Sequence, residues 1–330
     1  MLEVVTESRR IGAAVRRLRR RLGGVPSRGV TLSWAGGGRV VADIHWLRDH
    51  GFWWRHDATT RADRHGLTFG YAPSVPGRHE SATCEINLPV SGADRRLAGA
   101  ILRDADGALY LAHSGRIGGV RPGRGRDGLR AVLAGGHWQG VRWPAGRTGE
   151  MLVLAPIDGP RLARQIGRFV AAVHRYKRDG DDAPVVAPRL VARDDPAADA
   201  GNGADAESAR HAALCDRGLV LDALGEELGR RGLRDGDAAG AGDPLFAARG
   251  GGARLVDVET DLSPATLERA VGRLLLRRAG SPADSRAALV VPAQDAPAAL
   301  DGLSRHGIAV VRYRWRGARP VFDGLDDALA

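Results

Sequence analysis

Apolar positions recur along this chain with two spacings, and together they predict alternating helices and strands. Apolar residues return every three or four positions in segments 8–22, 159–176, 209–231, 263–278 and 296–306, as in helices that pack on one face. Short apolar or β-branched runs predict strands at 30–34, 39–44, 101–111, 151–156, 287–292 and 308–315, the third of them a hairpin that turns at Asp106-Gly107. This mixture predicts an α/β protein.

A segment of different composition separates two groups of these elements. Residues 180–208 are rich in Asp, Ala, Pro and Gly, and they hold too few apolar side chains to bury much surface. We therefore predict two domains, residues 1–179 and 209–330, joined by a flexible linker at 180–208. A length of 330 residues is typical of two domains.

The distribution of charge also separates the two halves of the chain. Residues 1–187 carry 30 Lys and Arg against 17 Asp and Glu, whereas residues 188–330 carry 19 against 22. A basic domain beside a slightly acidic one indicates that the first domain binds a polyanion. Nucleic acid is the favoured polyanion. An acidic membrane surface is the alternative, and no lipid-anchor motif supports it.

The composition disfavours several classes of protein. A hydrophobic content of 43% supports globular cores, and no run of 18 apolar residues predicts a membrane span. The arginine-rich start has no apolar signal core. Cys84 and Cys215 match no metal-ligand or disulfide pattern, so a cytoplasmic location is expected. The phosphate-binding motifs of kinases and dehydrogenases are absent, and no nucleotide cofactor is expected.

Two stretches of the first domain combine features suited to nucleic acid. Residues 46–56 are dense in aromatic and basic side chains, and Trp53 and Trp54 are candidates to stack on bases. Residues 85–130 interleave glycine with arginine, so main-chain N–H groups and guanidinium groups can hold phosphate oxygens. The alternatives for these stretches are core tryptophans and a plain surface loop, and the arginine-rich helix at 8–22 is either a solvated basic helix or a helix that contacts phosphates. The candidate contacts of the second stretch are Arg95, Arg96, His113, Arg116, Arg121, Arg124 and Arg126.

Three acids gather around two short predicted strands in the second domain. Asp257 and Glu259 end an apolar run, and both carboxylates point to one face because strand residues i and i+2 share a face. Asp243 precedes the neighbouring apolar step, across a glycine-rich turn, and can reach the same place. Carboxylates this close need a cation, and hard oxygen ligands suit Mg²⁺, or Mn²⁺ in its place. The alternative is a set of solvated acids at a strand edge.

The order of elements around these acids resembles the core of the PD-(D/E)XK nuclease superfamily, whose domains are restriction endonuclease-like. The resemblance covers residues 209–318 and implies a mixed central sheet flanked by helices. The first domain, with its EINLP…DRR…AG…H-x-GRIGG run, is similar to domains that accompany such nucleases in bacterial restriction-type proteins. The resemblance thus implies a mixed α+β domain that binds DNA.

The motif of that superfamily transfers to individual residues of this chain. Asp243 stands in the place of the first Asp, and Asp257 stands in the place of the second acid. The resemblance makes both of them metal ligands, with the main-chain carbonyl of Val258 as a third contact. Glu259 occupies the position of the lysine that normally orients or deprotonates the attacking water. Glutamate at this position acts as a ligand or base in active members, and it also occurs where a site has decayed.

The resemblance implies a metal-dependent DNA endonuclease of restriction or defence type, with DNA selected by the first domain. Arg273, in place of a frequent helical glutamine, and Arg254 would offset charge at the phosphate, and Glu226 would be an accessory acid. A homodimer is one arrangement, since many nucleases of this fold cut both strands as dimers. The alternatives are an inactive nuclease fold that binds DNA, a transcription regulator without a recognisable helix-turn-helix, and a first domain that binds RNA or a nucleotide.

Overall fold

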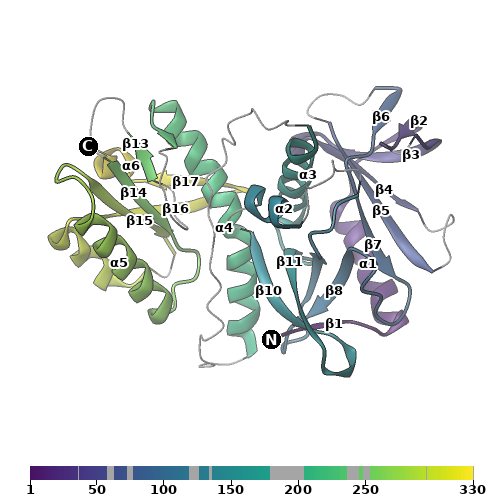
Figure 1. Cartoon of the computed structure of the whole chain (residues 1–330), viewed down its shortest axis with the longest axis horizontal. Helices are drawn as coiled ribbons and strands as arrows, with labels where there is room; N and C mark the ends of the chain where they lie inside the picture. Colours follow the sequence, from purple (N-terminus) through teal and green to yellow (C-terminus); the bar gives the residue numbers. More distant parts are fainter. Residues whose placement is uncertain are drawn as a thin grey trace. The chain divides into compact units, whose positions relative to one another are not determined.

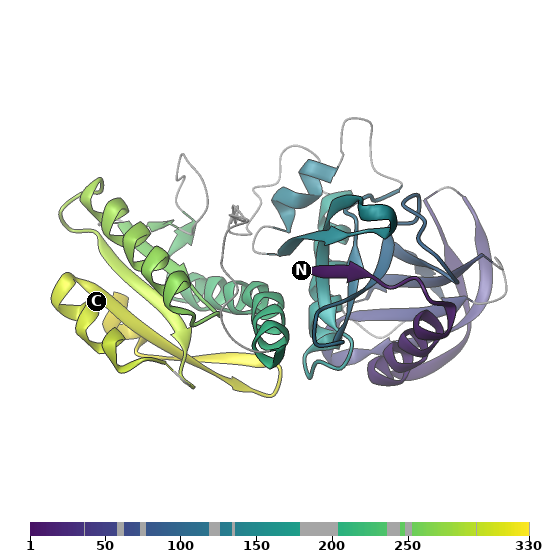
Figure 2. The same cartoon turned by 90° about the horizontal axis from the view of Figure 1, so that it is seen from below.

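The computed structural model describes most of the chain and divides it into two compact units. The described residues are 1–35, 37–57, 63–72, 77–118, 126–133, 136–178, 204–235, 245–247, 253–294 and 296–329. Among these, unit 1 holds residues 1–178 and 204–215, and unit 2 holds the residues from 216 onward (Figure 1, Figure 2). Both units contain helices and sheets, so the protein is a mixed α/β protein.

A closed barrel of five strands forms one part of unit 1. Its strands follow the order β1-β10-β11-β9-β8. The first strand of the chain completes the barrel, because β1 pairs in parallel with β10 and antiparallel with β8. The strands are β1 Leu2–Val4, β8 Gly99–Arg103, β9 Leu109–His113, β10 His137–Arg142 and β11 Thr148–Pro156.

A sheet of six strands forms the other part of unit 1, in the order β6-β2-β3-β4-β5-β7. Gly70 leaves room for the indole ring of its cross-strand neighbour Trp53, since a β-carbon there would lie 2.1 Å from Cε2 of Trp53. The strands are β2 Val25–Ser33, β3 Arg39–Leu47, β4 Phe52–Asp57, β5 Arg64–Tyr71, β6 His79–Ser81 and β7 Cys84–Pro89.

Helices cover these strands and complete the main core of unit 1. They are α1 Ser8–Leu22, α2 Arg126–Val132 and α3 Leu162–Arg178, with short 3-10 turns at Arg48–His50 and Pro144–Gly146. In α1 the apolar residues Ile11, Val15 and Leu18 return at helical spacing and are buried, while the seven arginines of the helix are exposed. These apolar residues share one cluster with Phe52 of β4 and Phe169 of α3.

Helix α4, Ala204–Arg230, contributes to both units, since its residues to Cys215 belong to unit 1 and those from Asp216 to unit 2. Its first part docks on unit 1 through polar contacts. The hydroxyl of Ser208 lies 2.7 Å from Asp104 Oδ2 and 2.9 Å from Asp106 Oδ2. The structure therefore differs from the predicted boundaries: residues 204–208 of the expected linker are helical, because Ser208 ties them to the barrel. Residues 180–203 lie outside the described residues.

The sheet of unit 2 has six strands in the order β12-β13-β14-β15-β16-β17. β12, β13 and β14 pair antiparallel, β14, β15 and β16 pair in parallel, and β17 returns antiparallel. The strands are β12 Arg234–Asp235, β13 Leu245–Ala247, β14 Ala253–Val258, β15 Arg286–Pro292, β16 Ile308–Arg316 and β17 Arg319–Asp323.

Helix α5, Pro264–Ala279, lies along one face of this sheet (Figure 1). Its residues Leu267 and Leu274 share a cluster with Leu255 of β14 and Leu289 of β15. The 3-10 helix η3, Ala298–His306, packs in the same cluster through Leu300 and precedes β16, and α6, Leu325–Leu329, follows β17. The described helices and strands of unit 2 thus follow the order α-β-β-β-α-β, continued by η3 and β16.

Most of the predicted helices and strands are present, with shifted ends. The structure also contains several elements that the sequence did not predict. The segment 296–306, predicted as a helix, is a 3-10 helix that ends at Gly307 with a left-handed φ of 69°, as its predicted C-cap requires. The sequence did not predict β1, β4, β5, β6, β7, β10, β17, α2 and α6, since they are short or lack clean alternation of apolar and polar residues. No helix in the described part of the chain is long and apolar enough to cross a membrane.

Candidate active site

The predicted acids of unit 2 lie at the carboxyl end of β14. Asp257 is the fifth residue of this strand and is fully buried, and Glu259 follows the strand and is 7% exposed. The main-chain N–H of Glu259 donates to the carbonyl of Val290 on β15 at 2.9 Å, which extends the pairing past the end of β14. Asp257 and Glu259 share the side of Leu255, which α5 covers.

An arginine of α5 holds both carboxylates. Nη2 of Arg273 donates to Oδ2 of Asp257 at 2.7 Å and to Oε1 of Glu259 at 2.6 Å, and its Nε donates to Oδ2 of Asp257 at 3.1 Å. The positive charge that two adjacent carboxylates require is therefore present as a guanidinium group. The side chain of Arg273 is 39% exposed, so the acid pair has one side near solvent.

A second arginine reaches the same site from α4. Nε of Arg217 donates to the carbonyl oxygen of Val258 at 2.8 Å, and its Nη2 lies 3.7 Å from Oδ1 of Asp257. The sequence did not single out Arg217, because it stands in a helix among the apolar residues that we took as core. Its burial, at 9% exposure, is the signal of a specific partner, and only the folded structure reveals it.

Burial changes the protonation of Glu259. Removal from water raises the pKa of its carboxyl to about 7, Arg217 and Arg273 oppose this rise, and the charge of Asp257 adds to it. Burial and the neighbouring carboxylate together outweigh the two arginines. Glu259 thus titrates near neutral pH, which suits a group that exchanges a proton with water.

The types of donor atom at this site suit a hard cation. It offers two carboxylates and the carbonyl of Val258, and Oδ1 of Asp257 is buried without a hydrogen-bond partner among the described residues. No group of three or more His, Cys, Asp or Glu within the described ranges is arranged to hold a metal ion. Asp243, the predicted third acid, lies outside the described residues.

The two other predicted accessory residues do not join the acid pair. Glu226 on α4 lies 3.1 Å from Nη2 of Arg319 on β17, in an exposed ion pair. Arg254 stands three residues before Asp257, so it belongs to the opposite side of β14, where its Nε donates to the carbonyl of Leu329 at 3.1 Å. Arg273 is the one predicted accessory residue that contacts the acids.

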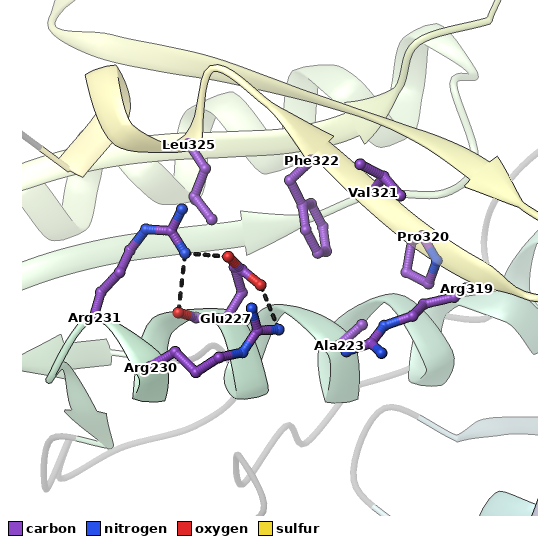
Figure 3. Close-up of a pocket in the computed structure, with 9 residues that line it drawn as sticks. All are labelled: Ala223, Glu227, Arg230, Arg231, Arg319, Pro320, Val321, Phe322 and Leu325. Carbon is purple, nitrogen blue, oxygen red and sulfur yellow. Dashed lines mark hydrogen bonds and ion pairs between the residues drawn. The ribbon is translucent and has the colours of Figure 1, made fainter.

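A pocket of about 510 Å³ elsewhere in unit 2 contains none of the predicted catalytic residues (Figure 3). Arg230, Arg231 and Arg319 line it around an apolar floor that includes Phe322. Glu227 faces two of these arginines, and its carboxylate pairs with Arg230 at 2.5 Å and also with Arg231. Internal carboxylates thus balance much of the positive charge in this pocket, and it offers no pair of acids for catalysis.

Two of the nucleic-acid candidates in unit 1 are core residues, so the prediction that they stack on bases is wrong. Trp53 is fully buried and Trp54 is 2% exposed. Trp53 packs with Val30, Leu32 and Ile44, and Nε1 of Trp54 donates to the carbonyl of Gly23 at 2.9 Å. The first three residues of β4 are buried in succession, so the aromatic run belongs to the interior.

His113 is also an interior residue, which contradicts its predicted contact with DNA. It is 1% exposed, and burial lowers the pKa of its imidazole to about 3. Its Nδ1 accepts a hydrogen bond from the main-chain N–H of Gly115 at 3.0 Å, and its ring packs against Phe169. A neutral, enclosed imidazole of this kind shapes the turn after β9 and has no surface to offer a phosphate.

The remaining candidates of unit 1 are described only in part. Arg95 lies over the ring of Trp143 at 5.8 Å, and a guanidinium N–H of Arg116 donates to its main-chain carbonyl. Arg96 is largely exposed and pairs with Asp94 at 3.0 Å. Arg121 and Arg124 lie outside the described residues, and Arg126 begins α2 without a described side chain.

Comparisons of this chain with protein families, with curated proteins and with solved structures found no match.

Proposed function

We propose that this protein is a metal-dependent deoxyribonuclease of restriction or defence type, in which unit 2 hydrolyses the phosphodiester and unit 1 selects DNA. The carrying observation is the buried pair Asp257 and Glu259 at the end of β14, in a unit with the element order α-β-β-β-α-β. This order and this place of the acids agree with the nuclease resemblance found in the sequence. Unit 1 contributes the excess of positive charge.

In this proposal each residue of the site has a different role in hydrolysis. Asp257 and the carbonyl of Val258 would hold Mg²⁺, which supplies an activated water and stabilises the leaving oxygen. Glu259, with a pKa raised to about 7, accepts a proton from the attacking water. Arg273, whose side chain is partly exposed, neutralises the acids at rest and would turn towards the phosphate when DNA binds.

A DNA cleavage assay with Mg²⁺ or Mn²⁺ tests this function, on plain and on base-modified plasmid DNA. We expect metal-dependent nicking or cutting that Asp257→Asn abolishes. Asp323→Asn is the matched control, because Asp323 pairs with Arg314 at 3.0 Å on the surface of the same unit. Cleavage that survives Asp257→Asn would exclude the acid pair as the active site.

An inert nuclease-like unit in a DNA-binding protein is the second candidate function. The arginine contacts favour it, because Arg273 holds both carboxylates and Arg217 holds the carbonyl of Val258. Glu259 in the place of the motif's lysine favours it as well. Salt-sensitive DNA binding without cleavage of any substrate would establish this second function in place of the first.

A further inference from the structure

Helix α1 presents its arginines to solvent in two flanks. Ile11, Ala14, Val15, Leu18 and Leu22 face the core, and Figure 2 shows the helix (purple) on the outside of unit 1. Residues at i, i+3, i+4 and i+7 share a side of a helix, which sorts the seven exposed arginines into two groups. One flank carries Arg10, Arg17 and Arg21, and the other carries Arg9, Arg16, Arg19 and Arg20.

The first flank is neutralised by carboxylates of the same unit. Arg17 lies 2.9 Å from Asp158 and Arg21 lies 3.8 Å from the same side chain. Arg10 lies 3.6 Å from Glu7, which precedes the helix. These three arginines already have anionic partners within the protein.

The second flank has no carboxylate partner among the described residues and faces a pair of histidines instead. The rings of His56 on β4 and His65 on β5 stack with centroids 5.6 Å apart. Burial, Arg19 and His65 lower the pKa of His56 to about 4, with a smaller effect of Arg55 and an opposing one of Asp57. Burial, Arg16 and Arg19 lower the pKa of His65. Burial is the main cause of both lowered pKa values, and the charges of Arg16 and Arg19 add to it.

Two features of this flank indicate an external anion. Four guanidinium groups on one side of a helix repel one another, and a bound polyanion relieves that repulsion. The carboxylates of Asp158 and Glu7 pair with the other flank, so no described carboxylate compensates these four guanidinium groups. From Arg9 to Arg20 the helix rises roughly 16 Å, the axial rise of about five phosphates along one DNA strand.

We propose that Arg9, Arg16, Arg19 and Arg20 of α1 form the surface of unit 1 that binds the phosphate backbone of duplex DNA. This inference rests on the proposed function, in which unit 1 selects DNA. It moves the main phosphate contact from the predicted glycine–arginine stretch to α1. A surface of this composition contacts backbone and not bases, so it supplies affinity without sequence preference.

Two triple variants of α1 test the proposal in the full-length protein. Arg16→Gln, Arg19→Gln and Arg20→Gln remove charge from the proposed surface, and Arg10→Gln, Arg17→Gln and Arg21→Gln remove the same charge from the paired flank. Fluorescence anisotropy measures Kd for a 20-base-pair duplex between 50 and 300 mM NaCl. Circular dichroism melting verifies that both variants fold, which the exposure of all six side chains favours.

The two variants are expected to differ in affinity and in salt dependence. The first should bind at least about 30-fold more weakly at 50 mM NaCl, with a slope of log Kd against log salt reduced by about 2 to 3, since each phosphate contact contributes about 0.9. The paired-flank variant should change the slope by less than about 1.

Several results would overturn the proposal. Equal losses in the two triple variants would show that only net charge matters, and absence of duplex binding by the unaltered protein would remove the ligand. Tighter binding to phosphatidylserine vesicles than to the duplex would assign the surface to membranes. DNA cleavage is measured in a separate assay. If only the first triple variant loses binding and the protein cleaves no DNA, this inference is supported and the nuclease proposal fails.

Discussion

Arg273 occupies the place between Asp257 and Glu259 where a metal ion would offset two negative charges. Arg273→Gln should therefore destabilise unit 2 by about 1–3 kcal/mol in the absence of divalent ions, a range reduced for the partial exposure of the guanidinium. Millimolar Mg²⁺ should restore much of this loss, because an ion bound only by the folded state stabilises it. Thermal melting of the variant with and without Mg²⁺ measures both effects.

The neighbouring Arg269→Gln provides the control for this prediction. Arg269 lies on the same helix one turn earlier, and its Nε donates to the carbonyl of Ala265 without contact to the acids. It should lower the melting temperature little and give no Mg²⁺ response. If the melting temperature of Arg273→Gln is the same with and without Mg²⁺, these carboxylates do not form a cation site.

The raised pKa of Glu259 makes the stability of unit 2 depend on pH. Between about 4.5, the ordinary pKa of the group, and about 7, the folded state keeps a proton that the unfolded state has released. The free energy of unfolding contributed by this group is therefore highest below pH 4.5 and falls as pH rises through this window. The fall amounts to about 2–3 kcal/mol by pH 8.

Glu259→Gln should remove this fall, because the amide does not titrate. Urea unfolding of the unaltered protein and the variant, each at pH 5 and pH 8, gives the difference. The subtraction cancels the buried histidines of unit 1, which have lowered pKa values and titrate in both proteins. A variant that loses as much stability between these pH values as the unaltered protein contradicts the assignment.

The first part of helix α4, which belongs to unit 1, depends on Ser208 for its packing within that unit. The hydroxyl of Ser208 shares its single proton between the carboxylates of Asp104 and Asp106, and its main-chain N–H donates to Asp106 at 3.1 Å. Ser208→Ala leaves two partly buried carboxylate oxygens without that donor. Hydrogen bonds to charged groups contribute about 1.5–3 kcal/mol, so the variant should weaken the docking of residues 204–215 by a similar amount.

Hydrogen exchange measures this docking directly. Peptides that cover residues 204–215 should lose protection in Ser208→Ala, while those of α5 should not. Ser304→Ala is the matched control, since Ser304 makes one long bond of 3.3 Å in an exposed position. Unchanged protection of 204–215 would show that the ring contacts of His211 with His137 and Tyr110 suffice to hold the helix.

The whole chain carries a net charge of +10, and its excess of positive charge lies in the first half of the sequence. If DNA binding resides in unit 1 and hydrolysis in unit 2, the two activities should respond to different changes. Raising NaCl from 50 to 200 mM should weaken duplex binding by about 10- to 100-fold through loss of counterion release. Asp257→Asn should show the same affinity and the same salt slope as the unaltered protein while it loses cleavage.

Filter binding and cleavage, measured on the same preparations, check this separation. The physical reason is that Asp257 is fully buried and that, in the described part of the chain, its carboxylate contacts Arg217 and Arg273 of unit 2. A DNA affinity that drops in Asp257→Asn would place DNA contacts within unit 2 and contradict the division of labour.

The sequence predicted features that depend on short spans of chain. Helical spacing of apolar residues located α1 at Ser8–Leu22, and the turn at Asp106-Gly107 located the hairpin of β8 and β9. The i, i+2 spacing of Asp257 and Glu259 placed both carboxylates on one side of β14, where Arg273 contacts them together. Backbone periodicity sets these relations, so neighbours in sequence suffice to predict them.

The tertiary structure alone decided which polar and aromatic residues are buried and what they contact. Arg217 reaches the carbonyl of Val258 across 41 positions of sequence, and no local pattern distinguishes it from the other arginines of the chain. The sequence around Trp53, Trp54 and His113 is rich in residues that suit nucleic-acid binding. In the folded protein, however, packing buries all three side chains. Burial and ion pairing depend on which distant segments meet, because desolvation and Coulomb energies are set in three dimensions and not along the chain.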